Sequence, residues 1–268
     1  MLPLKDYNPT RRFAFVTLGL IAVSVAVYFF VEPAGRSSFV STQQSSFQDA
    51  QFTLSRAAIP EEVVTGKPLT EAEVIDQYGT PNAAALCQGA IQGAVVRVQP
   101  ARACFPHKNV YLAILYSMFL HGSLLHIGGN MLFLWIFGNN IEDRWGGLRY
   151  LVFYLVAGIV ATMAHVLIYH HSRVPVVGAS GAIAGVMGAY FVLFPNVRIR
   201  TLFLFFFIFF LDVRAKWLLL LWLASQFLIN QGGVAWTAHV AGFVFGSLVG
   251  LIDRGGTAAR RRAEPAAR

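Results

Sequence analysis

Six apolar stretches constrain the fold of this 268-residue chain more than any other feature. They lie at about 13–31, 119–138, 150–169, 176–194, 216–230 and 235–252. A helix crosses the roughly 30 Å hydrocarbon core of a bilayer with about 20 apolar residues. Only 13% of the residues are charged, against about 25% in soluble domains. The sequence therefore predicts an all-α, polytopic membrane protein with six transmembrane helices.

Charge sets the expected orientation. The net charge is +8, but the basic residues form short clusters between the apolar stretches rather than one patch. This pattern follows the positive-inside rule, so we expect membrane lipid and no nucleic acid as a partner. It assigns both termini to the cytoplasm, as an N-terminal segment 1–12 and a basic tail 253–268 that is expected to be disordered from Gly255. The predicted location is the plasma (inner) membrane, in a multi-pass arrangement.

The run 201–211 (TLFLFFFIFFL) is apolar but too short to count as a span. As a helix it would rise about 16 Å, half of the hydrocarbon core. Basic residues flank both of its ends, so we expect an interfacial or re-entrant element. With this run excluded, the fourth and sixth stretches cross the membrane in the same direction.

The remaining domain boundaries follow from the positions of the six apolar stretches. Residues 13–31 are the first transmembrane helix, 32–108 an extracytoplasmic loop, and 109–252 a core with the other five helices. The core opens with 109–120, expected to be a short amphipathic helix at the interface. The chain's two cysteines, Cys87 and Cys104, both lie in the loop. They predict either a disulfide in an oxidising compartment or two unrelated free thiols.

Polar side chains within the apolar stretches are the candidates for function, because they lose water and need partners. Ser180 and His239 lie near the N-terminal ends of the fourth and sixth stretches, at matching depth. A serine and a histidine within reach of each other form a nucleophile and its general base. His126 and Asn130, four residues apart on one helix face, could stabilise an oxyanion together with the Ser180 backbone N–H. The alternative interpretation is a packing serine and a structural histidine.

Glycines favour the catalytic interpretation. Small residues let transmembrane helices approach closely. One such face carries Gly181, Gly185 and Gly188, and the other carries Gly242, Gly246 and Gly250. These faces would bring the serine and histidine helices together.

A metal site is the rival explanation for the histidines. His121 is nine residues from Asn130, which would place it on the opposite face of a continuous helix. We therefore expect His121 to be a structural residue. The sequence has no H-E-x-x-H motif and no carboxylate within the apolar stretches, so no metal and no cofactor is predicted.

The runs HGSLLHIGGNMLFLWIFGNNIEDRWG, GASGAIAG and AHVAGFVFG resemble those of the rhomboid family of intramembrane serine proteases, over about residues 109–252. The resemblance implies a six-span core with a water-filled cavity open to the outer face. It implies a Ser180–His239 dyad without an aspartate, with Asn130 and His126 on the oxyanion. It also implies that Glu142 and Arg144 are structural residues joining the second span to the third.

This sequence departs from the family's pattern at two places. Leu112 and Ala113 stand where Trp-Arg is frequent, and Ala184 stands where an aromatic residue often stacks on the base.

The predicted function is an endopeptidase that cleaves transmembrane proteins near the outer membrane surface through an acyl-enzyme. The alternative is a catalytically silent relative that binds transmembrane clients. A transporter would need paired helix breaks or charges at mid-depth, which the sequence lacks. The oligomeric state is not predicted.

Overall fold

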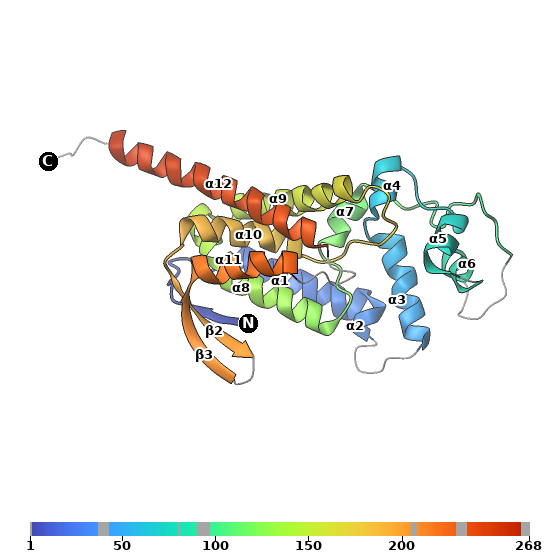
Figure 1. The fold of residues 1–268 in the computed structure, drawn as a ribbon, viewed down its shortest axis with the longest axis horizontal. Helices are drawn as coiled ribbons and strands as arrows, with labels where there is room; N and C mark the ends of the chain where they lie inside the picture. The colour runs from blue at the N-terminus through green and yellow to red at the C-terminus, as the bar shows by residue number, and fades with distance from the viewer. Residues whose placement is uncertain are drawn as a thin grey trace. The chain divides into compact units, whose positions relative to one another are not determined.

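The computed structural model describes residues 2–36, 43–79, 81–89, 97–204, 208–228 and 235–263. Figure 1 shows a mostly helical chain with one small antiparallel sheet. The sheet has the strand order β1-β2-β3, with β1 at Leu2–Asp6, β2 at Arg198–Leu204 and β3 at Ile208–Arg214. The all-α prediction was therefore wrong in this detail, because hydropathy does not separate a short apolar strand from a short apolar helix.

The helices in chain order are α1 (Phe15–Ala26), which continues as the π-helix η1 (Val27–Val31), α2 (Pro33–Arg36), α3 (Gln43–Arg56), α4 (Pro60–Thr65), α5 (Glu71–Tyr78), α6 (Pro81–Gln88), α7 (Leu112–Ser117), α8 (Leu124–Trp145), α9 (Gly147–Ile168), α10 (Ser180–Leu193), α11 (Ala215–Leu228) and α12 (Trp236–Ala263). They belong to two compact units. The first contains Met1–Ile21, Asn130–Ala161 and Ser180–Arg268, and the second contains Ala22–Gly129 and Thr162–Ala179.

A helix lies at each of the six apolar stretches. Within the described ranges, Gly147–Ile168 and Trp236–Gly256 are long and apolar enough to cross a membrane, and Phe15–Val31 and Ser180–Leu193 are shorter apolar helices. The last two residues of the expected stretch 216–230 lie outside the described residues. Six crossings thus remain a prediction.

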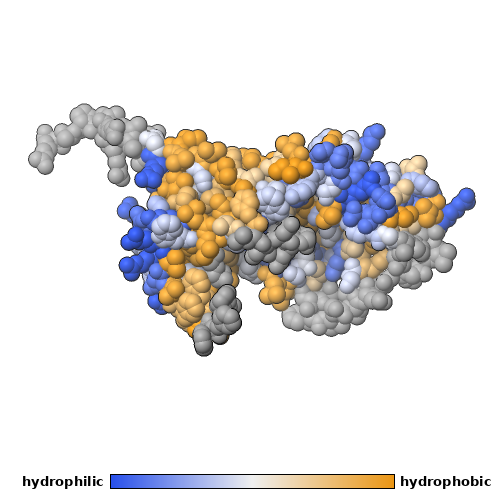
Figure 2. Space-filling view, in the orientation of Figure 1, coloured by the Kyte–Doolittle hydropathy of each residue, from blue (hydrophilic) through white to orange (hydrophobic). Residues whose placement is uncertain are grey.

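Apolar side chains also cover the outside of helices in the first unit (Figure 2). Val152 and Val156 of α9 are 54% and 39% exposed, and Leu248 and Ile252 of α12 are 55% and 76% exposed. Soluble proteins rarely leave large apolar patches facing water. The exposed apolar faces of α9 and α12 are suited to contact with the hydrocarbon of a membrane.

Two helices begin later than their apolar stretches. The predicted stretch 119–138 becomes α8 only at Leu124, because the Ser123 hydroxyl accepts a hydrogen bond from the His126 N–H at 3.2 Å and caps the helix. The predicted stretch 176–194 becomes α10 only at Ser180. Before it, Gly178 has a φ of 121°, which a helix cannot contain.

The C-terminal end also differs from expectation. α12 continues to Ala263, so the prediction of disorder from Gly255 was wrong for residues 255–263. Alanine and arginine are strong helix formers, and they fill most of this segment.

The run 201–211 is a β-hairpin. β2 and β3 pair from Arg198↔Arg214 to Leu204↔Ile208, and residues 205–207 between them lie outside the described residues. Aromatic and β-branched residues suit strands. At the base, the Ala215 N–H donates to the Val197 carbonyl at 2.8 Å and the Lys216 N–H to the Pro195 carbonyl at 3.0 Å. The chain therefore enters and leaves this element at the same place.

In the second unit, the described residues of the segment predicted as the loop 32–108 form short helices with a core of their own. α3, α5 and α6 bury a small core that includes Leu54, Leu69 and Val74. Cys87 and Cys104 are joined by a disulfide with an S–S distance of 2.04 Å. Glu62 and Lys108 form a buried ion pair. Burial raises the pKa of the Glu62 carboxyl and lowers that of the Lys108 ammonium, while their mutual attraction opposes both shifts.

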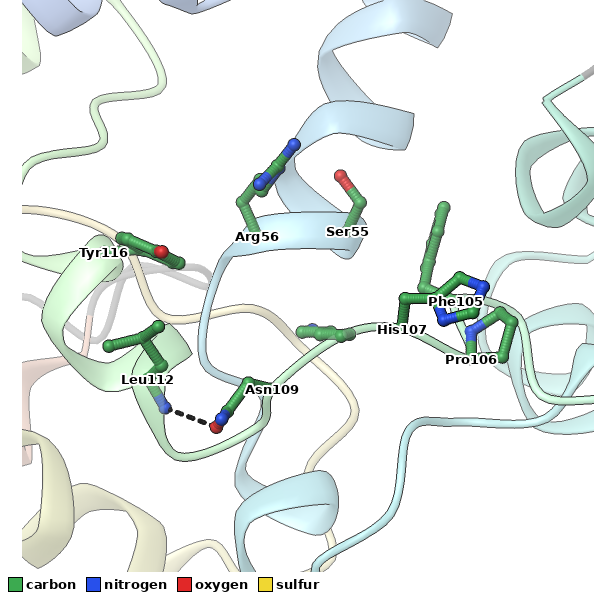
Figure 3. A pocket seen from close by; sticks show the side chains of 9 residues that line it. Ser55, Arg56, Phe105, Pro106, His107, Asn109, Leu112 and Tyr116 are labelled. Atoms are coloured by element: carbon green, nitrogen blue, oxygen red, sulfur yellow. Dashed lines mark hydrogen bonds between the residues drawn. The ribbon is translucent and has the colours of Figure 1, made fainter.

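The predicted helix at 109–120 is the shorter α7. The Asn109 side chain begins it by accepting a hydrogen bond from the Leu112 N–H at 2.9 Å (Figure 3). A pocket of about 390 Å³ beside it is lined by residues that include Arg56, His107 and Tyr116. All of its lining residues belong to the second unit, and none is a candidate catalytic residue.

The segment between α9 and α10 is anchored to this folded loop. The Glu61 N–H donates to the Ser172 carbonyl at 3.1 Å, and the Val176 N–H donates to the Ala58 carbonyl at 2.8 Å. Arg173 bridges Glu61 at 2.6 Å and Asp76 at 2.7 Å. The loop thus fixes the chain shortly before Ser180.

The hairpin makes a prediction about topology. Because its two ends are hydrogen-bonded to each other, reporters fused after Phe194 and after Lys216 should lie on the same side of the membrane. Paired alkaline phosphatase and green fluorescent protein fusions measure this directly. Opposite sides for the two fusion points would show that the run crosses the membrane.

The disulfide makes a second prediction. On full-length protein from intact membranes, a maleimide reagent should add to no cysteine before reduction and to two after it. The variant Cys104→Ser, which frees Cys87, is the control and should take one label without reductant. A crosslink that closes a loop of this length should stabilise the folded loop by about 3 kcal/mol, so reduction should speed its proteolysis. Two labels without reductant would contradict the bond.

Candidate active site

Ser180 is the first residue of α10, and its side chain is half-buried. The first N–H groups of a helix have no acceptor within the helix. At the start of α10 these groups, including that of Ser180, are suited to stabilise a negative charge that develops beside the hydroxyl. The sequence predicted Ser180 near the N-terminal end of a helix, and the structure makes it the first residue of that helix.

His239 lies in the first turn of α12, and its ring contacts Ser180. The Nε2 atom is 2.7 Å from Ser180 Oγ. This is the distance of a good hydrogen bond, so a ring nitrogen lies within reach of the hydroxyl proton.

The other side of the same ring contacts α11. His239 Nδ1 is 2.7 Å from Oε1 of Gln226, and the indole of Trp222 lies beside the imidazole with 5.9 Å between ring centroids. Gln226 was not among the site residues predicted from the sequence. An uncharged polar residue within an apolar stretch was the available signal, but it does not reveal the partner.

Ala184, where an aromatic residue was noted as missing, is fully buried at the contact between α10 and α12.

Glycines bring the two helices into backbone contact. A Cβ on Gly242 would lie 2.2 Å from the Gly181 carbonyl oxygen, and one on Gly246 would lie 1.8 Å from that of Gly185. A Cβ on Gly188 would lie 2.0 Å from the Phe243 carbonyl oxygen. Real Cβ atoms do not approach this closely, so any side chain at these positions would separate α10 from α12. Gly181 and Gly185 also face α9, where Cβ atoms would meet Ala161 and Ala157 at 2.8 and 2.7 Å.

Asn130 and His126 lie on α8, one turn apart. Asn130 is 9% exposed, and its Nδ2 has no hydrogen-bond partner among the described residues. A buried amide without a partner is unusual and leaves a donor available. Stabilisation of an oxyanion by Asn130 and His126 stays a prediction.

His121 does not follow the helical wheel drawn from the sequence. Because α8 begins at Leu124, His121 lies outside the helix, and its ring meets that of His126 edge-on with 5.2 Å between centroids. The prediction that it faces away from His126 was wrong. His121 is fully buried, and its N–H donates to the Glu32 carboxylate at 3.0 and 3.1 Å. This contact ties the end of the first helix to the start of α8.

Glu142 near the end of α8 holds the start of α1. Its carboxylate accepts hydrogen bonds from the Val16 N–H at 2.9 Å, and from the Thr17 N–H and hydroxyl at 2.8 Å each. It therefore satisfies donors that a helix start leaves free. Arg144, two residues on, pairs with Asp253 of α12 at 2.6 Å. The sequence predicted that Glu142 and Arg144 join the second span to the third. It did not predict their partners Thr17 and Asp253, which lie more than 100 residues away in the sequence.

Comparison with known proteins identifies the family. The family model described as Rhomboid domain matches residues 108–255. Rhomboid protein 1, mitochondrial, of Saccharomyces cerevisiae is 30% identical over 147 residues, covering 52% of this chain and 41% of that protein. Rhomboid protease GluP of Bacillus subtilis is 37% identical over 91 residues, covering 34% of this chain and 17% of that protein. The human presenilin-associated rhomboid-like protein, mitochondrial, is 33% identical over 93 residues, covering 34% and 24%. The chain thus spans less than half the length of each of these relatives.

The Glu142 contact makes a prediction about stability. Glu142→Ala leaves three donors around the buried Thr17 unpaired, and each unpaired donor costs about 1–3 kcal/mol. We expect a loss of at least about 3 kcal/mol, measured by thermal denaturation of the purified protein in detergent. The matched control is Asp143→Ala, because Asp143 accepts from the exposed N–H groups of Arg11 and Arg12 and should cost about 1 kcal/mol or less. Equal losses for the two variants would contradict the role given to Glu142.

Proposed function

The chain belongs to the rhomboid family, and from that premise we propose that it is an intramembrane serine endopeptidase that cleaves transmembrane proteins. The observation that carries the proposal is the 2.7 Å contact between Ser180 Oγ and His239 Nε2. Family membership alone does not establish catalysis, since a relative could bind such proteins without cutting them.

The proposed reaction begins at this contact. His239 Nε2 takes the hydroxyl proton as Ser180 Oγ attacks the scissile carbonyl carbon, and a tetrahedral oxyanion forms. The imidazolium then gives its proton to the leaving amine, and an acyl-enzyme on Ser180 remains. Water, activated by the same histidine, hydrolyses the ester and frees the serine. No aspartate is required in this scheme.

The oxyanion needs donors close to Ser180. The backbone N–H at the start of α10 is one, since it has no acceptor within its helix. We assign the amide of Asn130 and the imidazole of His126 as the others, because they lie one turn apart on α8 and the Asn130 amide lacks a partner among the described residues.

We further propose six membrane crossings with both termini in the cytoplasm, and a site that opens toward the extracytoplasmic face. The clustering of Lys and Arg between the apolar stretches supports this orientation. In this arrangement the β2–β3 hairpin lies on the cytoplasmic side, and the folded loop with its disulfide lies outside. We place the protein in a plasma (inner) membrane, where the substrates would be cleaved near the outer surface.

The experiment that tests the function is covalent labelling. The purified full-length protein should react with a fluorophosphonate probe, and Ser180→Ala should abolish the label while the chain's other serines remain present.

Cleavage of a transmembrane substrate should be almost completely lost in Ser180→Ala and in His239→Ala. The double variant should be little worse than either, because the two groups act as a unit.

Asn130→Ala provides a graded comparison. We expect a loss of roughly 10–1000-fold in kcat, since other oxyanion donors remain. A protein that takes no label on Ser180 and cleaves no substrate would favour the silent client-binding alternative. Near-full activity of His239→Ala would contradict the assignment of the base.

A further inference from the structure

We propose that Gln226 is a positioning residue of this site: its side-chain amide holds the His239 ring in the one tautomer and orientation that can accept the Ser180 proton. The inference rests on the proposed function and deepens it, because it names what orients a base that has no carboxylate assigned to it. Gln226 lies on α11, whereas Ser180 lies on α10 and His239 on α12.

The orientation of the Gln226 amide follows from its own contacts. Its Nε2 donates to the Trp222 carbonyl at 3.1 Å and to the Ser225 hydroxyl at 3.3 Å, both within α11. The nitrogen is therefore directed to its own helix, and the Oε1 oxygen is the atom that faces His239 at 2.7 Å. An amide oxygen accepts hydrogen bonds and cannot donate them.

The tautomer of the histidine follows from that oxygen. Because Oε1 can only accept, His239 Nδ1 must carry the ring proton. In a neutral imidazole the other nitrogen then has a free lone pair, and this nitrogen is Nε2, 2.7 Å from Ser180 Oγ. Without the amide, both tautomers would be open to His239, and in one of them Nε2 would carry a proton and could not act as the base.

The same contact restricts the ring in space. His239 is held at both nitrogens, by α11 on one side and α10 on the other, and the tilted Trp222 indole lies beside its ring. An amide oxygen also carries a partial negative charge, which favours the imidazolium that forms during the reaction. This charge is smaller than that of a carboxylate, so the contribution of Gln226 should be smaller than that of a full ionic partner.

A packing role for Gln226 predicts different behaviour, and Ser247 supplies the matched control. The Ser247 hydroxyl of α12 donates to the Gly188 carbonyl of α10 at 3.3 Å, so it is a polar contact between helices that does not involve His239. Ser247→Ala should lower the thermal stability slightly and leave kcat and its pH dependence unchanged.

The test compares Gln226→Met and Gln226→Glu with Ser247→Ala in the full-length protein. Methionine keeps the size but loses the acceptor, so kcat should fall roughly 10–100-fold while KM stays within about twofold. Glutamate keeps an acceptor and adds charge, so kcat should recover to within about tenfold of wild type. The acidic limb of its pH–rate profile should move to higher pH by about one unit. If Gln226→Met matched Ser247→Ala, or if Met and Glu lost activity equally with unmoved profiles, the proposal would be overturned.

A spectroscopic readout separates this proposal from the proposed function. In protein with ¹⁵N-labelled histidine, the His239 signals, assigned by their loss in His239→Ala, should show protonated Nδ1 and unprotonated Nε2. Gln226→Met should show a mixture of tautomers. This measurement does not depend on turnover. A wild type that neither labels nor cleaves would refute the peptidase, whereas one tautomer in both proteins would refute the role of Gln226 alone.

Discussion

The backbone contact between α10 and α12 is the constraint on which the site depends. Gly242 and Gly246 of α12 lie so close to the carbonyl oxygens of Gly181 and Gly185 that no Cβ would fit on either. Gly188 of α10 lies equally close to the carbonyl oxygen of Phe243. Lipid offers no hydrophobic force to press helices together, so close packing of small residues has to supply the attraction. The result is a pair of helix starts held at a fixed distance, with a hydroxyl on one and an imidazole on the other.

Polar contacts hold the other helices of the first unit around this pair. Glu142 accepts three hydrogen bonds from the start of α1. Asp6 at the end of β1 accepts from Asn140 of α8 and from the Tyr190 hydroxyl of α10, at 2.5 and 3.1 Å. Arg144 pairs with Asp253 of α12. Each contact connects segments far apart in the sequence, so the arrangement of α8, α10 and α12 is fixed at several points.

The sequence predicted those features that a single segment determines. Apolar length gave the positions of the helices, and glycine spacing gave the α10–α12 contact, because both depend on residues a few positions apart. The partners of Glu142, Arg144 and Gln226 depend on which helices become neighbours, and one sequence does not contain that information. The hairpin was missed for a different reason. The run 201–211 is apolar on every residue but Thr201, so it has no period from which to distinguish a strand from a helix.

Two different kinds of contact lie on either side of Ser180 along the chain. On its C-terminal side, Ser180 is part of a helix that packs closely on α12. On its N-terminal side, the Gly178 N–H donates to the Ser117 carbonyl at 2.8 Å, and Val176 pairs with Ala58 of the folded loop. Only Ala179 separates these two regions along the chain. Ser180 therefore follows a segment that is hydrogen-bonded to the folded loop, and it begins a helix that is packed on α12.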